Sequence, residues 1–420
     1  MLNFTAFFGT IITSYYGLGR PGEKLEVDNM KKLLAVGLAS AMALSLTACG
    51  AKEETAATTA AAAAATEAAK EAATEAAKAE TKNDAKVVVF WYDESDVYLS
   101  SVRDAMNKEF EALGITPDNQ FAANNQSTQI DQINTAIAGG ADILVVNQVT
   151  SGASDTAEDI IAAAGDIPVL FFNRAIGTDG SDVAVLEENS TIAFIGTDAP
   201  AAGHMQGKMI GEYVVANFDE IDLNKDGSIS YAMFKGDEAN VEAIYRTQYG
   251  LEDANAVLKE AGKPELVYFD PANTDCYQVD QGGAWSAAAA KEYMDTNFVS
   301  YNEANGNMIE LVICNNDGMA EGAIASLQEK GYNTGDGHVV PVFGVDATDN
   351  AKALISEGAM TGTIKQDAQG MAAAVAQSAK AIVDGTAPAE ALAGLNDERF
   401  SLDAECASKL YVAYAPYTGE

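Results

Sequence analysis

The segment Val169-Leu170-Phe171-Phe172-Asn173-Arg174 contains the pattern that decides the fold. Four consecutive large apolar residues have the length of one strand and leave no polar face, which is typical of a strand covered on both sides of a sheet. The run ends abruptly in an amide and a guanidinium, Asn173 and Arg174. In open α/β sheets, polar groups just past the carboxyl end of a strand lie where ligands bind.

The same pattern recurs along the chain. Strands are predicted over residues 87–92, 141–146, 169–172, 193–195, 230–235, 265–269, 309–314 and 340–345. Helices are predicted over residues 97–113, 157–164, 201–217, 241–262, 285–297, 319–330 and 350–358. Short apolar strands that alternate with helices predict parallel sheets with helices on both faces. Two series of similar length predict an α/β fold of two doubly wound parallel-sheet lobes.

Polar side chains follow strand after strand. The candidate ligand contacts among them are Asp96, Tyr98, Asn173, Arg174, Asn240, Glu242, Arg246, Asn316, Asp346 and Gln366. Most are carboxylates, planar amides or guanidinium groups, which make two hydrogen bonds at once, as a polyhydroxylated ligand such as a sugar requires. Tyr98 and Trp285 offer flat faces for the apolar C–H surface of a sugar ring. Any one of the polar residues could instead cap a helix, so the prediction depends on their recurrence.

The segment from Asp222 to Ser230 has the spacing of a cation-binding loop. Oxygen-bearing side chains stand at loop positions 1, 3, 5 and 9, and Gly227 stands at position 6, where Ca²⁺ loops make a sharp turn. Position 12, which carries a glutamate in an EF-hand, is Met233. The loop is therefore either an ordinary solvated turn or a calcium site completed by an acid from elsewhere in the chain.

The N-terminal region indicates export. Residues 30–49 begin with Met30 and two lysines, continue with an apolar core and end in Leu46-Thr47-Ala48-Cys49. This order is typical of a secretory signal and is too short for a membrane span. It resembles a bacterial lipoprotein signal, which implies cleavage before Cys49 and a lipid on that cysteine. Residues 1–29 have no signal-like order and are interpreted as a mis-called upstream extension.

Residues 50–85 are dominated by Ala, Thr, Glu and Lys and contain almost no large apolar side chain. Such a segment cannot build a core and is predicted to be a tether that holds the folded part away from a membrane. The formal net charge of −37 then lies mostly on the folded part. A strongly acidic surface repels phosphate backbones, so nucleic acid is excluded as a partner.

A family resemblance covers the chain from residue 87 to its end. It is carried by Asp96-Val97-Tyr98, Pro168–Asn173, Ile195–Asp198, Asp222–Ser230, Lys235-Gly236, Asn315–Asp317, Val342–Asp346 and Gly362-Thr363. In this order these segments resemble the periplasmic glucose/galactose-binding proteins, the substrate-binding subunits of ABC sugar importers. The resemblance implies two lobes joined by three crossings that close on a monosaccharide such as galactose, glucose or a methyl galactoside. It implies lobes of residues 86–196 plus 366–405 and of residues 197–365 plus 406–420.

The resemblance also implies roles for single residues. Tyr98 and Trp285 would stack on the two faces of the sugar, and Asp96 would accept from hydroxyls at one end. The remaining candidate contacts would form a ring of hydrogen-bonding groups. Asn240, Glu242 and Gln366 depart from the residues usual in the family, so the identity of the sugar stays open.

The same resemblance completes the cation loop, because Glu310 matches the family's distant bidentate ligand. The implied shell for a structural Ca²⁺ is Asp222, Asn224, Asp226, Ser228, Ser230 and Glu310. No organic cofactor is expected. The implied partners are an ABC permease and, through the lipid alone, the outer face of the cytoplasmic membrane; the protein is expected to be a monomer.

Other classes fit less well. The chain has two histidines and lacks the His-Glu-x-x-His, Gly-x-Ser-x-Gly and Walker motifs, and a glycosidase would need two carboxylates at a defined separation. We therefore expect no enzyme. A sugar-responsive repressor would carry a helix-turn-helix where this chain has a signal and a tether. A sensory lipoprotein that presents its ligand to a chemoreceptor or sensor kinase remains an alternative to transport.

Overall fold

The computed structural model describes residues 85–419 except 179 and 336. The predicted upstream extension, the signal with Cys49 and nearly all of the tether lie outside the described residues. Within the described part, no helix combines the length and the apolar character that crossing a bilayer requires.

The first lobe contains one seven-stranded sheet in the order β12-β13-β5-β4-β3-β1-β2. Its strands are β1 (Val87–Trp91), β2 (Asp118–Phe121), β3 (Ile143–Val146), β4 (Val169–Phe172), β5 (Ile192–Gly196), β12 (Phe400–Leu402) and β13 (Lys409–Val412). Neighbouring strands are parallel except for β12 and β13, which pair antiparallel. The predicted parallel sheet is therefore confirmed.

Both faces of this sheet are buried, which explains the uninterrupted apolar runs. In β1, Val87, Val89 and Trp91 pack into a core with helices α2 (Val97–Ala112) and α11 (Ala368–Val383). Val88 and Phe90 of the same strand point the other way, into a second core with α3 (Gln126–Ala138), α4 (Ser154–Ala164) and α5 (Ser181–Glu188). The short helix α12 (Pro388–Ala393) packs beside α11.

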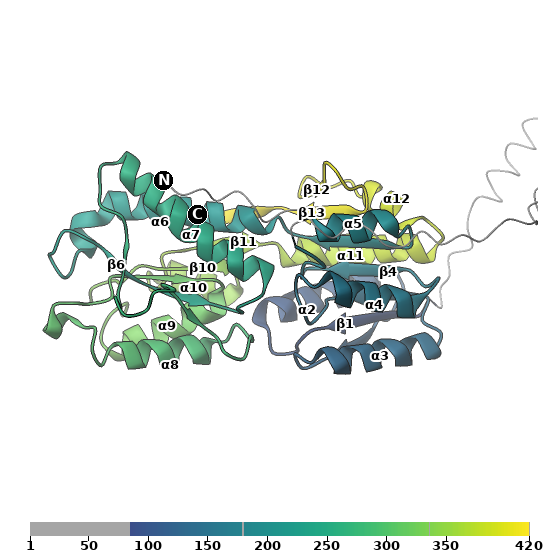
Figure 1. Ribbon diagram of the computed structural model, residues 1–420, viewed down its shortest axis with the longest axis horizontal. Helices are drawn as coiled ribbons and strands as arrows, with labels where there is room; N and C mark the ends of the chain where they lie inside the picture. The colour runs from purple at the N-terminus through teal and green to yellow at the C-terminus, as the bar shows by residue number, and fades with distance from the viewer. Residues whose placement is uncertain (1–84, 179, 336, 420) are drawn as a thin grey trace, which may run out of the picture. The chain divides into compact units, whose positions relative to one another are not determined.

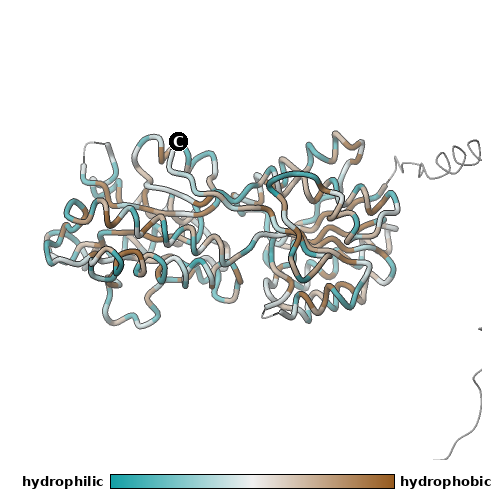
Figure 2. Tube along the Cα trace, turned by 90° about the horizontal axis from the view of Figure 1, so that it is seen from above, coloured by the Kyte–Doolittle hydropathy of each residue, from teal (hydrophilic) through white to brown (hydrophobic). Residues whose placement is uncertain are grey.

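The second lobe repeats this plan with the order β14-β11-β10-β9-β6-β7, and β8 pairs with β6. Its strands are β6 (Ser230–Lys235), β7 (Val267–Tyr268), β8 (Gln278–Val279), β9 (Leu311–Cys314), β10 (Val342–Asp346), β11 (Gly362–Gln366) and β14 (Tyr414–Tyr417). Its helices are α6 (Ala199–Ile221), α7 (Val241–Glu260), α8 (Ala287–Asn297), α9 (Asp317–Glu329) and α10 (Asp349–Ser356), with a 3₁₀ turn at Glu303–Asn305. Figure 1 shows α6 and α7 on one side of the sheet and α8 and α9 on the other. Figure 2 shows hydrophobic segments running through the interior of both lobes.

Glycines on α6 bring it unusually close to α7. A Cβ on Gly203 or Gly207 would lie 2.4 Å from a backbone oxygen of α7, and one on Gly211 would lie 2.6 Å from Val257. Only the absence of a side chain permits this approach. Helix α7 is thereby fixed against the lobe, and with it the residues of its first turns.

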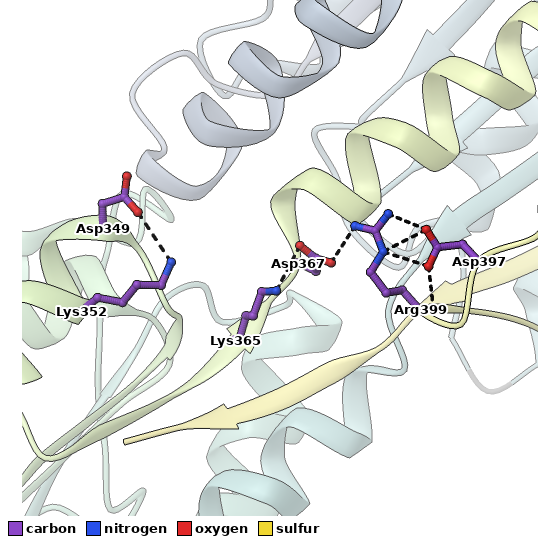
Figure 3. A network of polar contacts seen from close by, with 6 residues as sticks. All are labelled: Asp349, Lys352, Lys365, Asp367, Asp397 and Arg399. Carbon is purple, nitrogen blue, oxygen red and sulfur yellow. Dashed lines mark hydrogen bonds and ion pairs between the residues drawn. The ribbon is translucent and has the colours of Figure 1, made fainter. Parts of the chain in front are cut away.

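The chain crosses between the two sheets three times, after β5, after β11 and after β13. At the second crossing, Asp367 directly precedes α11, and its carboxylate lies between Lys365 at 3.4 Å and Arg399 at 3.1 Å (Figure 3). The predicted three crossings are therefore confirmed.

Two predicted lobe boundaries are wrong. Residues 406–412 belong to the first lobe, because β13 pairs with β5 through Leu410 and Ile195, and Cys406 packs in the first lobe's core. Residue 366 belongs to the second lobe, because Gln366 still pairs with Tyr414 in the second sheet.

Candidate functional site

One pocket brings together all eleven candidate ligand contacts. Its lining consists of Asp96, Tyr98, Asn173, Arg174, Asn240, Glu242, Arg246, Trp285, Asn316, Asp346 and Gln366, together with Tyr92. The empty space among them, including open solvent at the mouth, is about 370 Å³. The structure thus confirms that these residues share one pocket, while their contact with a sugar stays a prediction.

The pocket follows from the topology of the two sheets. In the first sheet β1 lies between β2 and β3, and in the second β6 lies between β7 and β9, so a crevice opens at the carboxyl ends where the strand order reverses. Asn173 and Arg174 follow β4, and Asn316 follows β9 by two residues. Asp346 and Gln366 are the last residues of β10 and β11. Lining residues come from both lobes.

Three pocket residues of the first lobe hold one another in place. The Tyr92 hydroxyl donates to Asp96 Oδ2 at 2.7 Å, and the Arg174 guanidinium lies over the Tyr92 ring, 3.4 Å from its centroid. Asp96 Oδ1 accepts from the backbone N–H of Leu99 at 2.8 Å and so also caps α2. Burial, and after it the nearby Asp96 carboxylate, raises the pKa of Tyr92 well above its usual value, so its hydroxyl remains a donor.

Sequence reasoning missed Tyr92. It was placed as the last residue of the predicted first strand, whereas β1 ends one residue earlier, at Trp91. The signal that could have found it is the rule already applied to the other strands. A residue with a polar group directly after an apolar run, such as the hydroxyl of Tyr92, lies at the carboxyl edge of the sheet.

Arg246 on α7 is the most extensively bonded residue of the pocket. Its Nη1 donates to the Asn315 carbonyl at 2.9 Å. Its Nη2 donates to Gln366 Oε1 at 2.8 Å and to the Tyr414 hydroxyl at 3.0 Å. The side chain is buried, and a buried guanidinium with charge-assisted hydrogen bonds is held rigidly.

Trp285 lies against a glycine. A Cβ on Gly236 would be 2.1 Å from the indole ring, so the absence of that atom lets the ring occupy its place. Trp285 also has a positive φ of 57°, and its carbonyl accepts from Asn316 Nδ2 at 3.2 Å. Asn173 and Asp346 have positive φ as well, 62° and 129°. Such uncommon backbone conformations often gather at functional sites.

Four buried polar atoms of the pocket have no hydrogen-bond partner among the residues that the structure describes. They are the Tyr98 hydroxyl, Arg174 Nη2, Glu242 Oε2 and Arg246 Nε. A buried polar atom without a partner costs about 1–3 kcal/mol, so this arrangement suits a ligand that supplies both donors and acceptors.

Burial also perturbs the acids of the pocket. It raises the pKa of Glu242, an effect that the neighbouring Arg246 opposes. Burial, and after it the nearby Asp317, raises the pKa of Asp346 well above its usual range. Both carboxyls are thus more easily protonated than free acids, which allows them to donate as well as accept.

The loop Asp222–Ser230 and Glu310 are in direct contact, as predicted. Glu310 Oε1 accepts from the backbone N–H of Asn224 at 2.7 Å, and its Oε2 accepts from the backbone N–H and the hydroxyl of Ser230 at 2.9 and 3.2 Å. Asp222 accepts from the backbone N–H groups of Asp226 and Gly227. Burial raises the pKa of Glu310.

The donor set of this loop fits Ca²⁺, because all of its candidate ligands are oxygens. The arrangement of these oxygens does not fit a bound Ca²⁺, because the carboxylates accept hydrogen bonds from the loop's own backbone N–H groups. Across residues 85–178, 180–335 and 337–419, no three His, Cys, Asp or Glu side chains are grouped closely enough to hold a metal ion. The calcium site stays a prediction.

Comparisons with known proteins agree with this fold. Residues 87–387 match the family described as periplasmic binding protein domain. The chain is 32% identical over 313 residues to the D-galactose/methyl-galactoside binding periplasmic protein MglB of Haemophilus influenzae, covering 73% of this chain and 84% of that protein. It is 25% identical over 292 residues to the D-xylose-binding periplasmic protein of Escherichia coli, covering 68% and 74% of the two chains.

Solved structures with the same fold include an ABC transporter periplasmic solute binding protein from Actinobacillus succinogenes with bound D-allose. The TM-score is 0.60 at 18% identity, over 80% of this chain and 98% of that one. The family consists of binding proteins, which confirms the prediction that this chain is not an enzyme. By its matched residues and by its identity to the Haemophilus protein, the chain belongs to the periplasmic binding protein domain family.

Proposed function

We propose that this protein is the extracellular substrate-binding protein of an ABC importer and that its pocket captures a monosaccharide. The observation that carries the proposal is the pocket itself, where amides, carboxylates and guanidinium groups from both lobes surround a space that holds four buried, unpartnered polar atoms. A sugar supplies the matching donors and acceptors. The sugar-binding relatives support the same ligand class.

The ligand would lie between Tyr98 and Trp285, with its hydroxyls bonded from both sides. Galactose, glucose and methyl galactosides are the first candidates, because a relative named for D-galactose and methyl-galactoside is 32% identical. Glu242 and Gln366 have longer side chains than the residues usual in the family and would shape the choice among them.

Capture would couple binding to lobe closure. Asp96 and Arg174 belong to the first lobe, whereas Arg246, Trp285 and Asp346 belong to the second. A ligand that bonds both sets favours the state in which the lobes approach, since that state alone offers every contact. The closed protein would then deliver the sugar to the permease.

The remaining proposals concern location and metal. We propose that Cys49 carries a lipid and that residues 50–85 tether the protein to the outer face of the cytoplasmic membrane. We also propose that Ca²⁺ binds the loop Asp222–Ser230 with Glu310 in a structural role, which requires the loop's N–H groups to release their carboxylates.

A thermal-shift screen of hexoses, pentoses and inositols tests the ligand class, because a ligand that binds only the folded state raises the melting temperature. At least one monosaccharide should raise it, and calorimetry should give a Kd at or below the micromolar range, about −8 kcal/mol. Replacing Trp285 or Asp346 by alanine should abolish most of this affinity. A screen in which no sugar shifts the melting temperature contradicts the proposal.

A further inference from the structure

A chain of buried hydrogen bonds runs from the pocket to all three interlobe crossings. Arg246, which lines the pocket, donates from Nη2 to the Tyr414 hydroxyl at 3.0 Å. That hydroxyl in turn donates to Thr197 Oγ1 at 2.8 Å. The same Nη2 donates to Gln366 Oε1 at 2.8 Å. All four side chains are buried, with exposures between 3% and 7%.

The partners of Arg246 mark the crossings one by one. Thr197 directly follows β5, at the first crossing, and Gln366 ends β11, at the second. Tyr414 begins β14 directly after the third. These segments are far apart in sequence. Arg246 bonds directly to Gln366 and Tyr414 and, through Tyr414, to Thr197.

The direction of the hydrogen bonds makes Tyr414 the link. A tyrosine hydroxyl has one proton to donate and lone pairs to accept with. In Tyr414 the proton goes to Thr197 while a lone pair receives Arg246. Burial raises the pKa of Tyr414, so the hydroxyl keeps the proton that this relay requires.

Arg246 lines the pocket and keeps one uncommitted donor among its guanidinium nitrogens. Nη1 and Nη2 donate to protein oxygens, whereas Nε is buried and bonds to none of the described residues. A ligand oxygen that accepts from Nε would bond to a group whose opposite edge is fixed to the crossings.

We infer that Tyr414 is a positioning residue that anchors Arg246 to the first and third crossings, while Gln366 anchors it to the second, so that ligand contact with Arg246 is transmitted to the hinge. The inference rests on the proposed sugar-binding function and goes beyond it, because Tyr414 and Thr197 do not line the pocket. The hydrogen bonds from Arg246 to the crossings would then couple the bound ligand to lobe closure.

The test uses the full chain and a sugar panel of D-galactose, D-glucose, D-xylose, D-allose and myo-inositol. Affinity for the tightest binder is measured by calorimetry in Tyr414→Phe, Thr197→Val, the double variant and Thr197→Ser. Tyr414→Phe should weaken binding roughly tenfold, the size expected for one hydrogen bond to a charged group. The double variant should be no weaker than Tyr414→Phe alone, because both changes break the same relay. Thr197→Ser keeps the hydroxyl and should restore the affinity of the unaltered protein.

Lobe closure is read separately by energy transfer between dyes on Glu111→Cys of α2 and Glu292→Cys of α8, with Cys49 and Cys276 changed to serine. At saturating sugar, Tyr414→Phe should show a smaller ligand-induced change in transfer than the parent. If Tyr414 supported only a pocket contact, its loss would lower the affinity but leave the change in energy transfer at saturating sugar intact.

Tyr417→Phe, which alters a tyrosine of the same strand that does not line the pocket, is the control and should behave as the parent. Unchanged affinity in Tyr414→Phe, additive effects in the double variant or an unchanged saturated signal overturns the inference alone. Failure of the unaltered protein to bind any sugar overturns the proposed function as well.

Discussion

Gly236 is the position at which one methyl group should disable the pocket without touching the ligand. A Cβ there would lie 2.1 Å from Trp285 Cδ2, and ordinary contact begins at 3.4 Å, so the indole must move by at least 3.4 − 2.1 = 1.3 Å. Gly236 does not require a positive φ, and its backbone N–H can still donate to Asn315 Oδ1. The substitution Gly236→Ala therefore acts through the displaced ring.

The expected loss follows from what the ring provides. Aromatic contact contributes about 0.5–1.5 kcal/mol beyond area burial, and loss of buried apolar area adds about 25 cal/mol per Å². We expect a total near 2 kcal/mol, roughly a 30-fold rise in Kd.

Calorimetry with the tightest-binding monosaccharide measures the affinity, and tryptophan emission reports the displaced indole, since the chain has only two tryptophans. Gly394→Ala is the matched control, because its Cβ would approach nothing closer than 3.4 Å. A Gly236→Ala protein with altered tryptophan emission and parental affinity would refute the stacking role of Trp285.

Three further predictions concern the charged groups. Arg246→Met should lower the free energy of unfolding by about 1–3 kcal/mol in urea titrations, because it leaves the buried Asn315 carbonyl and Gln366 Oε1 without their charged hydrogen-bond donor; a change below about 0.5 kcal/mol would contradict this. Burial raises the pKa of Asp317 from 3.8 to about 7, so the folded state holds a proton that the unfolded chain releases, and stability should fall as pH rises from about 4 to 7. Asp317→Asn should flatten that fall in unfolding titrations, whereas exposed Asp219→Asn should leave it unchanged; an equal slope in Asp317→Asn argues against the shift. If Ca²⁺ binds the loop, a chelator should lower the melting temperature of the parent but not of Glu310→Gln, and equal melting curves for the parent with and without chelator would count against the site.

The sequence was most informative where apolar runs end in polar residues. The runs now seen as β4 and β6 were predicted with their observed ends, because each contains an uninterrupted apolar run, Val169–Phe172 in β4 and Tyr231–Phe234 in β6. The eleven pocket residues were predicted together for the same reason. Parallel strands bring their carboxyl ends to one edge, so residues far apart in sequence meet there.

Elements whose sequence lacks a clear change from large apolar to polar residues were not predicted. Helix α11 (Ala368–Val383) was not predicted, because alanine dominates its sequence, and alanine marks a buried face less clearly than large apolar side chains do. The register of β13 could not be read from sequence either, since its pairing with β5 depends on contacts between segments more than 200 residues apart. The bonds of Arg246 to Gln366 and Tyr414 were hidden for the same reason.

The central claim is that one sugar is bonded by both lobes at once, and paired calorimetric titrations of Asp96→Asn and Asp346→Asn test it most directly. Each substitution keeps the size of the side chain and alters one lobe only. The structure predicts that both variants bind the monosaccharide at least about tenfold more weakly than the parent. Parental affinity in either variant would show that its lobe makes no essential contact and would contradict the account.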